Sequence, residues 1–383
     1  MQKELPLNAK VEMVIDTDKP YKIYAESAEH TALKQFESAM QQSFAVKGAL
    51  MPDVHSGYTL PIGAVVATKG VIVPSWIGFD IGCGVLAVKT TAKKEWVEQH
   101  TNNIFDEVYK AVPTGFSNNA RPCKASMLDV KDLSPYGREA FERRGGWNAL
   151  GSLGGGNHFI EIGYDENEDV WITVHSGSRG PGHGIATEFM RLASPTGKAS
   201  EGHYGFSTES ALGKDYINDM GWALQFALDN REEIMHRVLF VLTMFIPGCH
   251  SVGQPINRNH NHAEQKGKLW IHRKGATHAD QGMLGVVPGN MRDGVFITEG
   301  KGNPDSLWSS SHGAGRVMGR GEAKEKLTME DFRVSMKGIK AKVELSTLDE
   351  SYGAYKNIFD VMRQQEELVE VLHYVRPIIN IKG

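Results

Sequence analysis

Glycine is concentrated in a few polar clusters, and this concentration limits what the chain can fold into. The 42 glycines are unevenly distributed, and 17 of them gather in GFDIGCG, GSLGGGNH, HSGSRGPGHG, VPGNMRDG and SHGAGRVMGRG, where nearly every cluster also holds His, Asp, Cys, Asn or Arg. Glycine weakens the interior of a helix or strand, but it permits positive φ angles and close backbone approach to a ligand. The clusters therefore predict loops around one glycine-lined site.

Short strand-like runs alternate with helical ones between these clusters. Strands are expected at Ala64 to Pro74, Asp169 to Ser178, Lys268 to Ala276 and Gly294 to Gly300, which are β-branched or aromatic and end in turn residues. Helices are expected from Tyr216 to about Phe245, after a capping Thr328, and from Phe359 to about Val375. Because no regular strand–helix–strand rhythm is present, the pattern favours an α+β fold. No repeat or linker divides the chain, so we expect one domain over residues 1–383.

The composition is typical of an ordinary globular protein. The 383 residues are 40% hydrophobic and 23% charged, and the formal net charge of −4 argues against non-specific coating of nucleic acid. A local basic groove would still accommodate a phosphate backbone. The cysteines number three, the N-terminus lacks an apolar signal core, and residues 229–233 interrupt the longest apolar-rich region with DNREE. We expect a cytoplasmic monomer without a membrane segment.

Asp80 and Cys83 stand three residues apart between glycines in GFDIGCGV. A carboxylate offers hard oxygen and a thiolate offers a soft sulfur that can bridge two ions, so the pair predicts a metal site if histidines join it. Histidines in similar settings are His158, His175, His260 and His312. No HExxH or CxxC signature is present, so such a site would be assembled across the fold. The alternative is that Cys83 is a small buried hydrophobe, Asp80 a turn residue and each histidine structural.

Two glycine clusters also carry arginines. SGSRGPGHG and HGAGRVMGRG combine flexible backbone amides with Arg179, Arg316 and Arg320, and both features bind phosphate oxygens well. Neither a GxxxxGK[ST] loop nor a GxGxxG turn occurs, which argues against a P-loop or an ordinary dinucleotide site. The alternative is a pair of surface turns with solvated arginines.

The order of the motifs resembles the RtcB family of RNA-splicing ligases. The blocks are MPDVHSGYTLPIGAVVATKG, GFDIGCGV, GSLGGGNHFIEI, VHSGSRG, NHNHAEQ, HRKGA, VPGNM, SHGAGRVMGR and the final IKG, and they cover most of the chain from Met51 to Gly383. The resemblance implies the family's own α+β fold. It also implies a GTP- and Mn²⁺-dependent ligase that joins RNA 3′-phosphate or 2′,3′-cyclic phosphate ends to 5′-hydroxyl ends. The implied setting is RNA repair or tRNA splicing, and the sequence does not say whether an activating partner protein is needed.

The resemblance also assigns roles to individual residues. Two Mn²⁺ ions are expected at Asp80, Cys83, His158, His175 and His260, with Cys83 bridging them. His312 is expected to attack the α-phosphate of GTP, release pyrophosphate and become guanylylated; guanylate then passes to an RNA 3′-phosphate, and a 5′-hydroxyl displaces GMP. The expected nucleotide-binding residues are Asn157, Glu161, Asn290, Ala314, Gly315, Tyr355 and Lys382. Lys382 would donate to the base and Glu161 would accept the guanine N1 and N2 hydrogens, while Arg179 and Arg316 would hold phosphate.

The chain departs from the family in two places. Where PGSMG is usual it reads PGNMR, so Asn290 and Arg292 replace a serine and a glycine, and THADQ introduces His278 and Asp280 where smaller residues are common. These changes concern the nucleotide-binding loop and indicate a divergent, specialised repair branch. The alternatives are a guanylyl-capping enzyme for RNA or DNA 3′-phosphates and a dinuclear metal phosphoesterase, which the same ligands would serve. A silent RNA-binding protein is disfavoured by the full set of ligands and nucleophile.

Overall fold

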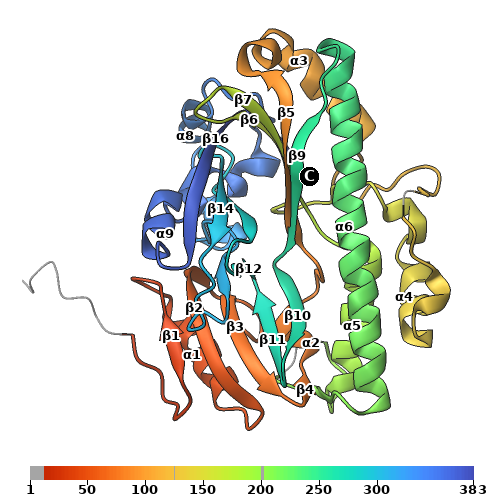
Figure 1. Ribbon diagram of the computed structural model, residues 1–383, viewed down its shortest axis with the longest axis vertical. Helices are drawn as coiled ribbons and strands as arrows, with labels where there is room; N and C mark the ends of the chain where they lie inside the picture. Colours follow the sequence, from red (N-terminus) through yellow and green to blue (C-terminus); the bar gives the residue numbers. More distant parts are fainter. Residues whose placement is uncertain (1–12, 125, 200–201) are drawn as a thin grey trace, which may run out of the picture.

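Two β-sheets organise the part of the chain that the computed structural model describes, residues 13–124, 126–199 and 202–383 (Figure 1). The seven-stranded sheet has the order β13 (Leu284–Pro288), β14 (Val295–Gly300), β16 (Val369–Lys382), β6 (Phe159–Tyr164), β7 (Asp169–Ser176), β5 (Gly84–Lys93) and β9 (Ser251–Asn259). The five-stranded sheet has the order β1 (Tyr21–Ile23), β2 (Ala45–His55), β3 (Ile62–Lys69), β11 (Leu269–Lys274) and β10 (Asn261–Lys266). Short ladders join β12 (Ala276–His278) to β15 (Ser309–Ser311), and β4 (Val71–Ile72) to β8 (Phe206–Ser207).

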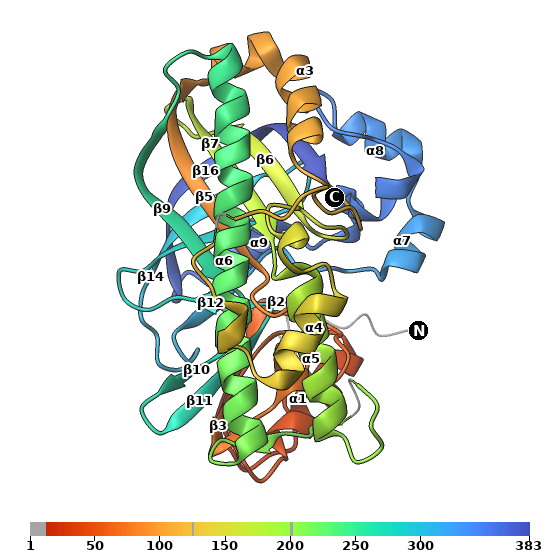
Figure 2. The same cartoon turned by 90° about the vertical axis from the view of Figure 1, so that its right-hand side faces the viewer.

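Helices surround these sheets. They are α1 (His30–Met40), α2 (Pro74–Ile77), α3 (Lys94–Ala111), α4 (Pro135–Arg143), α5 (Arg179–Ala193), α6 (Ala211–Phe245), α7 (Arg320–Lys326), α8 (Met329–Ser335) and α9 (Ile358–Gln364), with 3-10 turns η1 (Val130–Asp132), η2 (Gly146–Ala149), η3 (Leu345–Glu350) and η4 (Tyr352–Ala354). Figure 2 shows α6 crossing in front of the strands of the larger sheet, with α3 beside its upper end. Among the described residues, no helix combines the length and apolar character needed to cross a membrane.

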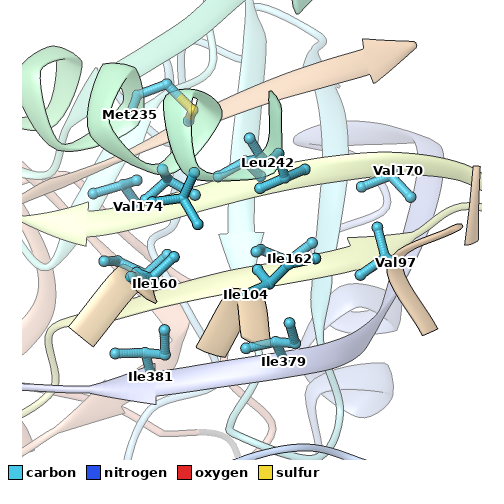
Figure 3. Close-up of a cluster of buried hydrophobic side chains, with 14 of the residues drawn as sticks. Val97, Ile104, Ile160, Ile162, Val170, Val174, Met235, Leu242, Ile379 and Ile381 are labelled. Atoms are coloured by element: carbon cyan, nitrogen blue, oxygen red, sulfur yellow. The ribbon is translucent and has the colours of Figure 1, made fainter. Parts of the chain in front are cut away.

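The central strands of the larger sheet have two chemically different faces. Side chains alternate between the faces of a strand, and Ile160, Ile162, Val174, Ile379 and Ile381 pack with α3 and α6 in one buried cluster (Figure 3). The opposite face of the same strands carries Phe159, Glu161, His175, Asn380 and Lys382. Pairing places Phe159 opposite both His175 and Lys382, so these side chains lie across neighbouring strands. The apolar face anchors the sheet, and the polar face forms part of the site.

Most of the expected elements are confirmed. Strands β7, β11 and β14 lie within the expected segments, and the first expected strand is divided at Gly70 into β3 and β4. Helix α6 begins a little earlier than expected, where Ser210 accepts a hydrogen bond from the Gly213 amide. Thr328 caps α8 by accepting from the Asp331 amide. The mixed α and β content agrees with the expected fold class.

The expected C-terminal helix from Phe359 to Val375 is wrong. Helix α9 ends at Gln364, and the chain continues from Val369 as strand β16, which pairs with β14 along its first half and with β6 along its second. Within this segment, residues 369–375 pair with β14, and this long-range pairing outweighs the local apolar spacing.

Candidate active site

The expected metal ligands lie together in the folded chain. Cys83 Sγ lies 3.4 Å from His158 Nε2 and 3.3 Å from His175 Nε2. His175 Nε2 lies 3.4 Å from His260 Nε2, and Asp80 Oδ2 lies 3.0 Å from His158 Nε2. Ligand atoms of Cys83, His158 and His175 all lie within 4.8 Å of one another. The thiol, imidazoles and carboxylate therefore converge on one small volume.

Tight backbone geometry brings these side chains into the cluster. His175 is on β7, while Cys83 directly precedes β5 and His158 directly precedes β6. Gly82 has a φ of 74°, and a Cβ there would lie 2.8 Å from the Ala227 Cβ of α6. A Cβ on Gly177 would lie 2.2 Å from Asp80 Oδ1. The glycine clusters thus allow the close approach that the sequence predicts.

Burial sets the protonation of the cluster. It lowers the pKa of His175 and of His260 well below the usual value, so both imidazoles are neutral and carry a free lone pair. Burial, together with the charge of Asp80, raises the pKa of the Cys83 thiol. Burial acts to raise the Asp80 pKa as well, but the hydrogen bond and electrostatic interaction with His158 outweigh it and lower that pKa. Neutral imidazoles, a carboxylate and a sulfur form a donor set that fits transition-metal ions.

His312 is held in one orientation by a residue that the sequence predictions missed. Its Nδ1 lies 2.7 Å from Asp53 Oδ2, and the same oxygen accepts from the backbone amides of His312 at 3.0 Å and Gly313 at 3.3 Å. A carboxylate accepts hydrogen bonds, so Nδ1 carries the proton and Nε2 keeps its lone pair. The ring also packs edge-on against His260, with centroids 4.6 Å apart. His312 is thus preorganised to use Nε2 beside the metal-ligand cluster.

Two cavities meet at His312. The first, about 280 Å³, is lined by Phe159, His175, Asn290, Ala314, Gly315, Tyr355, Asn380 and Lys382 among others. The second, about 640 Å³, opens onto Asp80, Cys83, His260 and Lys274. His312, Asn157 and Arg316 line both cavities. His312 therefore lies between a smaller cavity, which reaches the expected ligand His175, and a larger one, which reaches three other expected ligands.

The smaller cavity contains a buried ion-pair network centred on Glu350, a second residue that the sequence predictions missed. Lys382 Nζ lies 2.7 Å from Glu350 Oε2, and the Tyr355 hydroxyl donates to the same oxygen at 2.6 Å. Arg316 and Arg320 approach Glu350 Oε1 at 3.3 and 2.6 Å. Burial acts to raise the Glu350 pKa, but Lys382 and Arg320 hold it at about 2. Glu350 is therefore a fixed counter-charge for the basic side chains of this cavity.

Glu161 is a buried carboxyl that pairs with no cationic side chain in the described part of the chain. Its Oε2 accepts from Asn380 Nδ2 at 3.0 Å, and its Oε1 has no hydrogen-bond partner among the described residues. Burial raises its pKa to about 8. Asn380 lines the smaller cavity, whereas Glu161 lines neither cavity and lies behind Asn380 with one carboxyl oxygen unpaired.

The two arginines expected to bind phosphate occupy different surroundings. Arg316 donates to the carbonyl oxygens of Met318 and Asp349 besides pairing with Glu350, so it is part of the cavity wall. Arg179 has a left-handed backbone with φ of 55°, and its Nη1 lies 3.5 Å from His158 Nδ1. Its Nε is buried without a hydrogen-bond partner among the described residues. Arg179 and Arg316 are partly buried and contact protein groups, unlike the solvated arginines of a surface turn, whereas Arg320 is exposed.

The residues that depart from the family pattern have local partners. Asn290 lines the smaller cavity, while Arg292 pairs with Asp293 and lies 3.9 Å over the Tyr352 ring. His278 contacts His262 and Glu264, and the Arg273 guanidinium lies in the same group. Neither His278 nor Asp280 lines either cavity. The change at THADQ therefore lies outside both cavities. Of the four departing residues, only Asn290 lines the cavity that contains the expected nucleotide contacts.

The chain is similar to known proteins over nearly its whole length. The profile of the family described as tRNA-splicing ligase RtcB matches residues 35–147 and 124–383. The RNA-splicing ligase RtcB of Escherichia coli K12 is 33% identical, covering 97% of this chain and 99% of its own length. The tRNA-splicing ligase RtcB of Nanoarchaeum equitans is 27% identical, covering 99% of this chain and 97% of its own length. An RtcB homologue from Entamoeba dispar is 27% identical over 92% of this chain.

Proposed function

The chain belongs to the RtcB family, and from that premise we propose that it is a GTP- and Mn²⁺-dependent RNA ligase. It joins 3′-phosphate or 2′,3′-cyclic phosphate ends of RNA to 5′-hydroxyl ends through a guanylyl-histidine at His312. The proposed setting is RNA repair or tRNA splicing in the cytoplasm, with the protein as a monomer.

The position of His312 between the two cavities is the observation that carries this proposal. A ligase that transfers a nucleotide must bind the nucleotide on one side of its nucleophile and the RNA ends on the other. The smaller cavity, with Lys382, Tyr355 and Asn380, suits the guanylate, and the larger one, with the metal-ligand cluster, suits the phosphate ends. A phosphoesterase would need only the second chamber.

His312 would act as the nucleophile through Nε2. The Asp53 carboxylate holds the proton on Nδ1 and compensates the positive charge that develops on the ring. As Nε2 forms its bond to the α-phosphorus of GTP, the bond to pyrophosphate breaks and pyrophosphate leaves. The guanylate is then transferred to an RNA 3′-phosphate, and the 5′-hydroxyl of the second end displaces GMP.

Two Mn²⁺ ions would be held by Asp80, Cys83, His158, His175 and His260, with the Cys83 sulfur shared. When bound, they would neutralise phosphate charge and lower the pKa of a bound water or hydroxyl. Arg179, behind His158 with an unpaired Nε, would add a positive charge to this end of the larger cavity. Burial keeps His175 and His260 neutral and thus ready to coordinate.

The guanine base would be recognised by Glu161 and Lys382. The free Oε1 of Glu161 supplies an acceptor for the N1 and N2 hydrogens that distinguish guanine from adenine. Lys382 is held at Glu350 and is positioned to donate toward the base. Asn157, Asn290, Ala314, Gly315 and Tyr355 line the cavity around this position.

A ligation assay with defined ends tests the proposal against its alternatives. Purified protein with Mn²⁺ and GTP should join a 3′-phosphate RNA to a 5′-hydroxyl RNA, and Cys83→Ala should lose both bound manganese and joining. Accumulation of 3′-guanylylated RNA without joining would indicate a capping enzyme instead. Release of phosphate without GTP would indicate a phosphoesterase, and RNA binding without any turnover would indicate a silent protein.

A further inference from the structure

Aromatic side chains form one wall at the mouth of the larger cavity. Tyr58 and Phe79 both line it, and Tyr58 is 74% exposed. Their rings meet edge-on, with centroids 5.8 Å apart and an interplanar angle of 89°. Phe79 in turn stacks on His183 of α5, with centroids 5.1 Å apart and an angle of 18°. The catalytic roles proposed above use none of these rings.

The wall is held rigidly. Gln35 of α1 accepts from the Gly57 amide at 3.0 Å and donates to the carbonyl oxygens of Gly57 at 2.7 Å and Tyr58 at 3.1 Å. These bonds fix the backbone of the loop that carries Tyr58. Phe79 follows Gly78 and immediately precedes Asp80, so the wall is tied directly to a candidate metal ligand. An exposed tyrosine on a fixed backbone loses little conformational entropy when it binds a ligand.

We propose that Tyr58 and Phe79 form a stacking platform for the terminal nucleobase of an RNA end whose phosphate or hydroxyl enters the larger cavity. The platform rests on the proposed function, because it assigns the substrate of that function a second contact. Its position supports this occupant: the aromatic wall and the metal-ligand cluster line the same cavity, as the base and the reacting group of one nucleotide require.

Stacking suits an enzyme that recognises ends rather than sequences. Every base presents a π-face, so aromatic stacking adds affinity without base selection. If Tyr58 were instead an ordinary surface tyrosine, RNA binding would not depend on the terminal base.

The test measures RNA binding by fluorescence anisotropy, with the terminal base present or absent. Labelled 3′-phosphate and 5′-hydroxyl RNAs are each made with an intact or an abasic terminal nucleotide. For one of the two ends, the wild type should bind the abasic RNA about tenfold more weakly than the intact RNA. Tyr58→Ala should bind the intact RNA about tenfold more weakly than the wild type does, and it should bind the intact and abasic RNAs equally. Tyr58→Phe should behave as wild type. Trp96→Ala, at another exposed aromatic residue that lines neither cavity, is the matched control.

The outcomes separate the platform from the proposed function. Equal penalties for the abasic change in wild type and Tyr58→Ala, at both ends, would overturn the platform even if ligation occurs. Base-dependent binding that Tyr58→Ala abolishes would support it. If wild type binds RNA in this way but neither labels with GTP nor joins ends, the proposed function fails while the binding result stands.

Discussion

A single carboxylate determines the tautomer and the orientation of the His312 imidazole. Asp53 Oδ2 accepts from the ring Nδ1 and from two backbone amides, so one residue fixes both the tautomer and the position of the imidazole. Asp53 lies in the block MPDVHSGY, which supports the family resemblance, yet no local pattern relates it to a histidine 259 positions later. The residue types indicated candidate ligands and the family resemblance assigned their roles, while this orienting partner required the fold.

Glu161 predicts a pH dependence of guanine binding. Its pKa of about 8 keeps the carboxyl largely protonated at pH 6, and a protonated carboxyl offers fewer acceptors to the guanine N1 and N2 hydrogens. Guanosine affinity should therefore rise up to about tenfold per pH unit between pH 6 and 8 and then level off. Calorimetry with guanosine measures this without a titrating phosphate. Glu161→Gln should remove the rise, and an unchanged pH profile in that variant would contradict the assignment.

The same shift predicts the sign of a stability change. The folded pKa of Glu161 lies above its usual value of 4.5, so its contribution to stability is full below pH 4.5 and is lost as pH rises to about 8. Glu161→Gln should therefore unfold at higher denaturant concentration than wild type at pH 8, by about 1–3 kcal/mol in unfolding free energy. Under the proposed function, Glu161 would bind guanine at a cost in stability.

At the level of elements, the sequence of a central strand indicates which side chains share a face, but it does not indicate which strand pairs with it. Segments such as FIEI and INIK alternate apolar and polar residues, although neither is among the expected strands. That β16 lies between β14 and β6, and brings Lys382 opposite Phe159, depends on long-range pairing that no local spacing contains. The same limitation explains why Phe359 to Val375 was predicted to be a helix.

Gly82 tests whether a turn positions the metal ligands. Gly82→Ala would place a Cβ 2.8 Å from Ala227 while keeping a φ of 74°, and the resulting shift should displace Cys83 and weaken Mn²⁺ binding at least about tenfold. Gly70→Ala is the matched control, because Gly70 also has a positive φ, 68°, but no atom lies within 4 Å of its Cβ position. Gly70→Ala should lose about 1 kcal/mol of stability from its positive φ alone, and Gly82→Ala should lose more because of the added contact. Equal manganese affinity in the two would show that Gly82 has no positioning role.

Across the whole molecule, the expected ligands come from strand β7 and from segments next to other strands, and the fold brings them together. Glu350 shows this best: it lies in an unremarkable segment, and its role becomes visible only once Lys382, Arg316 and Arg320 surround it. The sequence predicted the donor types and the presence of a glycine-lined site. It could not predict that two cavities share His312.

Net charge predicts how RNA binding responds to salt. With a formal charge of −4, the protein should contact the ends of RNA rather than a long phosphate track. The slope of log affinity against log salt should then be about −1.4, as for roughly two single-strand phosphates. Anisotropy titrations over a range of salt concentrations, with short and long RNAs, measure it. A slope that steepens with RNA length would indicate an extended binding track.

The most direct test of the central claim is covalent labelling of His312. Wild-type protein incubated with Mn²⁺ and α-phosphate-labelled GTP, then denatured, should retain an acid-labile and alkali-stable label, as expected for a phosphoramidate. His312→Ala should bind manganese normally and retain no label. A label that survives in His312→Ala, or no label on wild type with bound manganese confirmed, would contradict the assignment of His312 as the nucleophile between the two cavities.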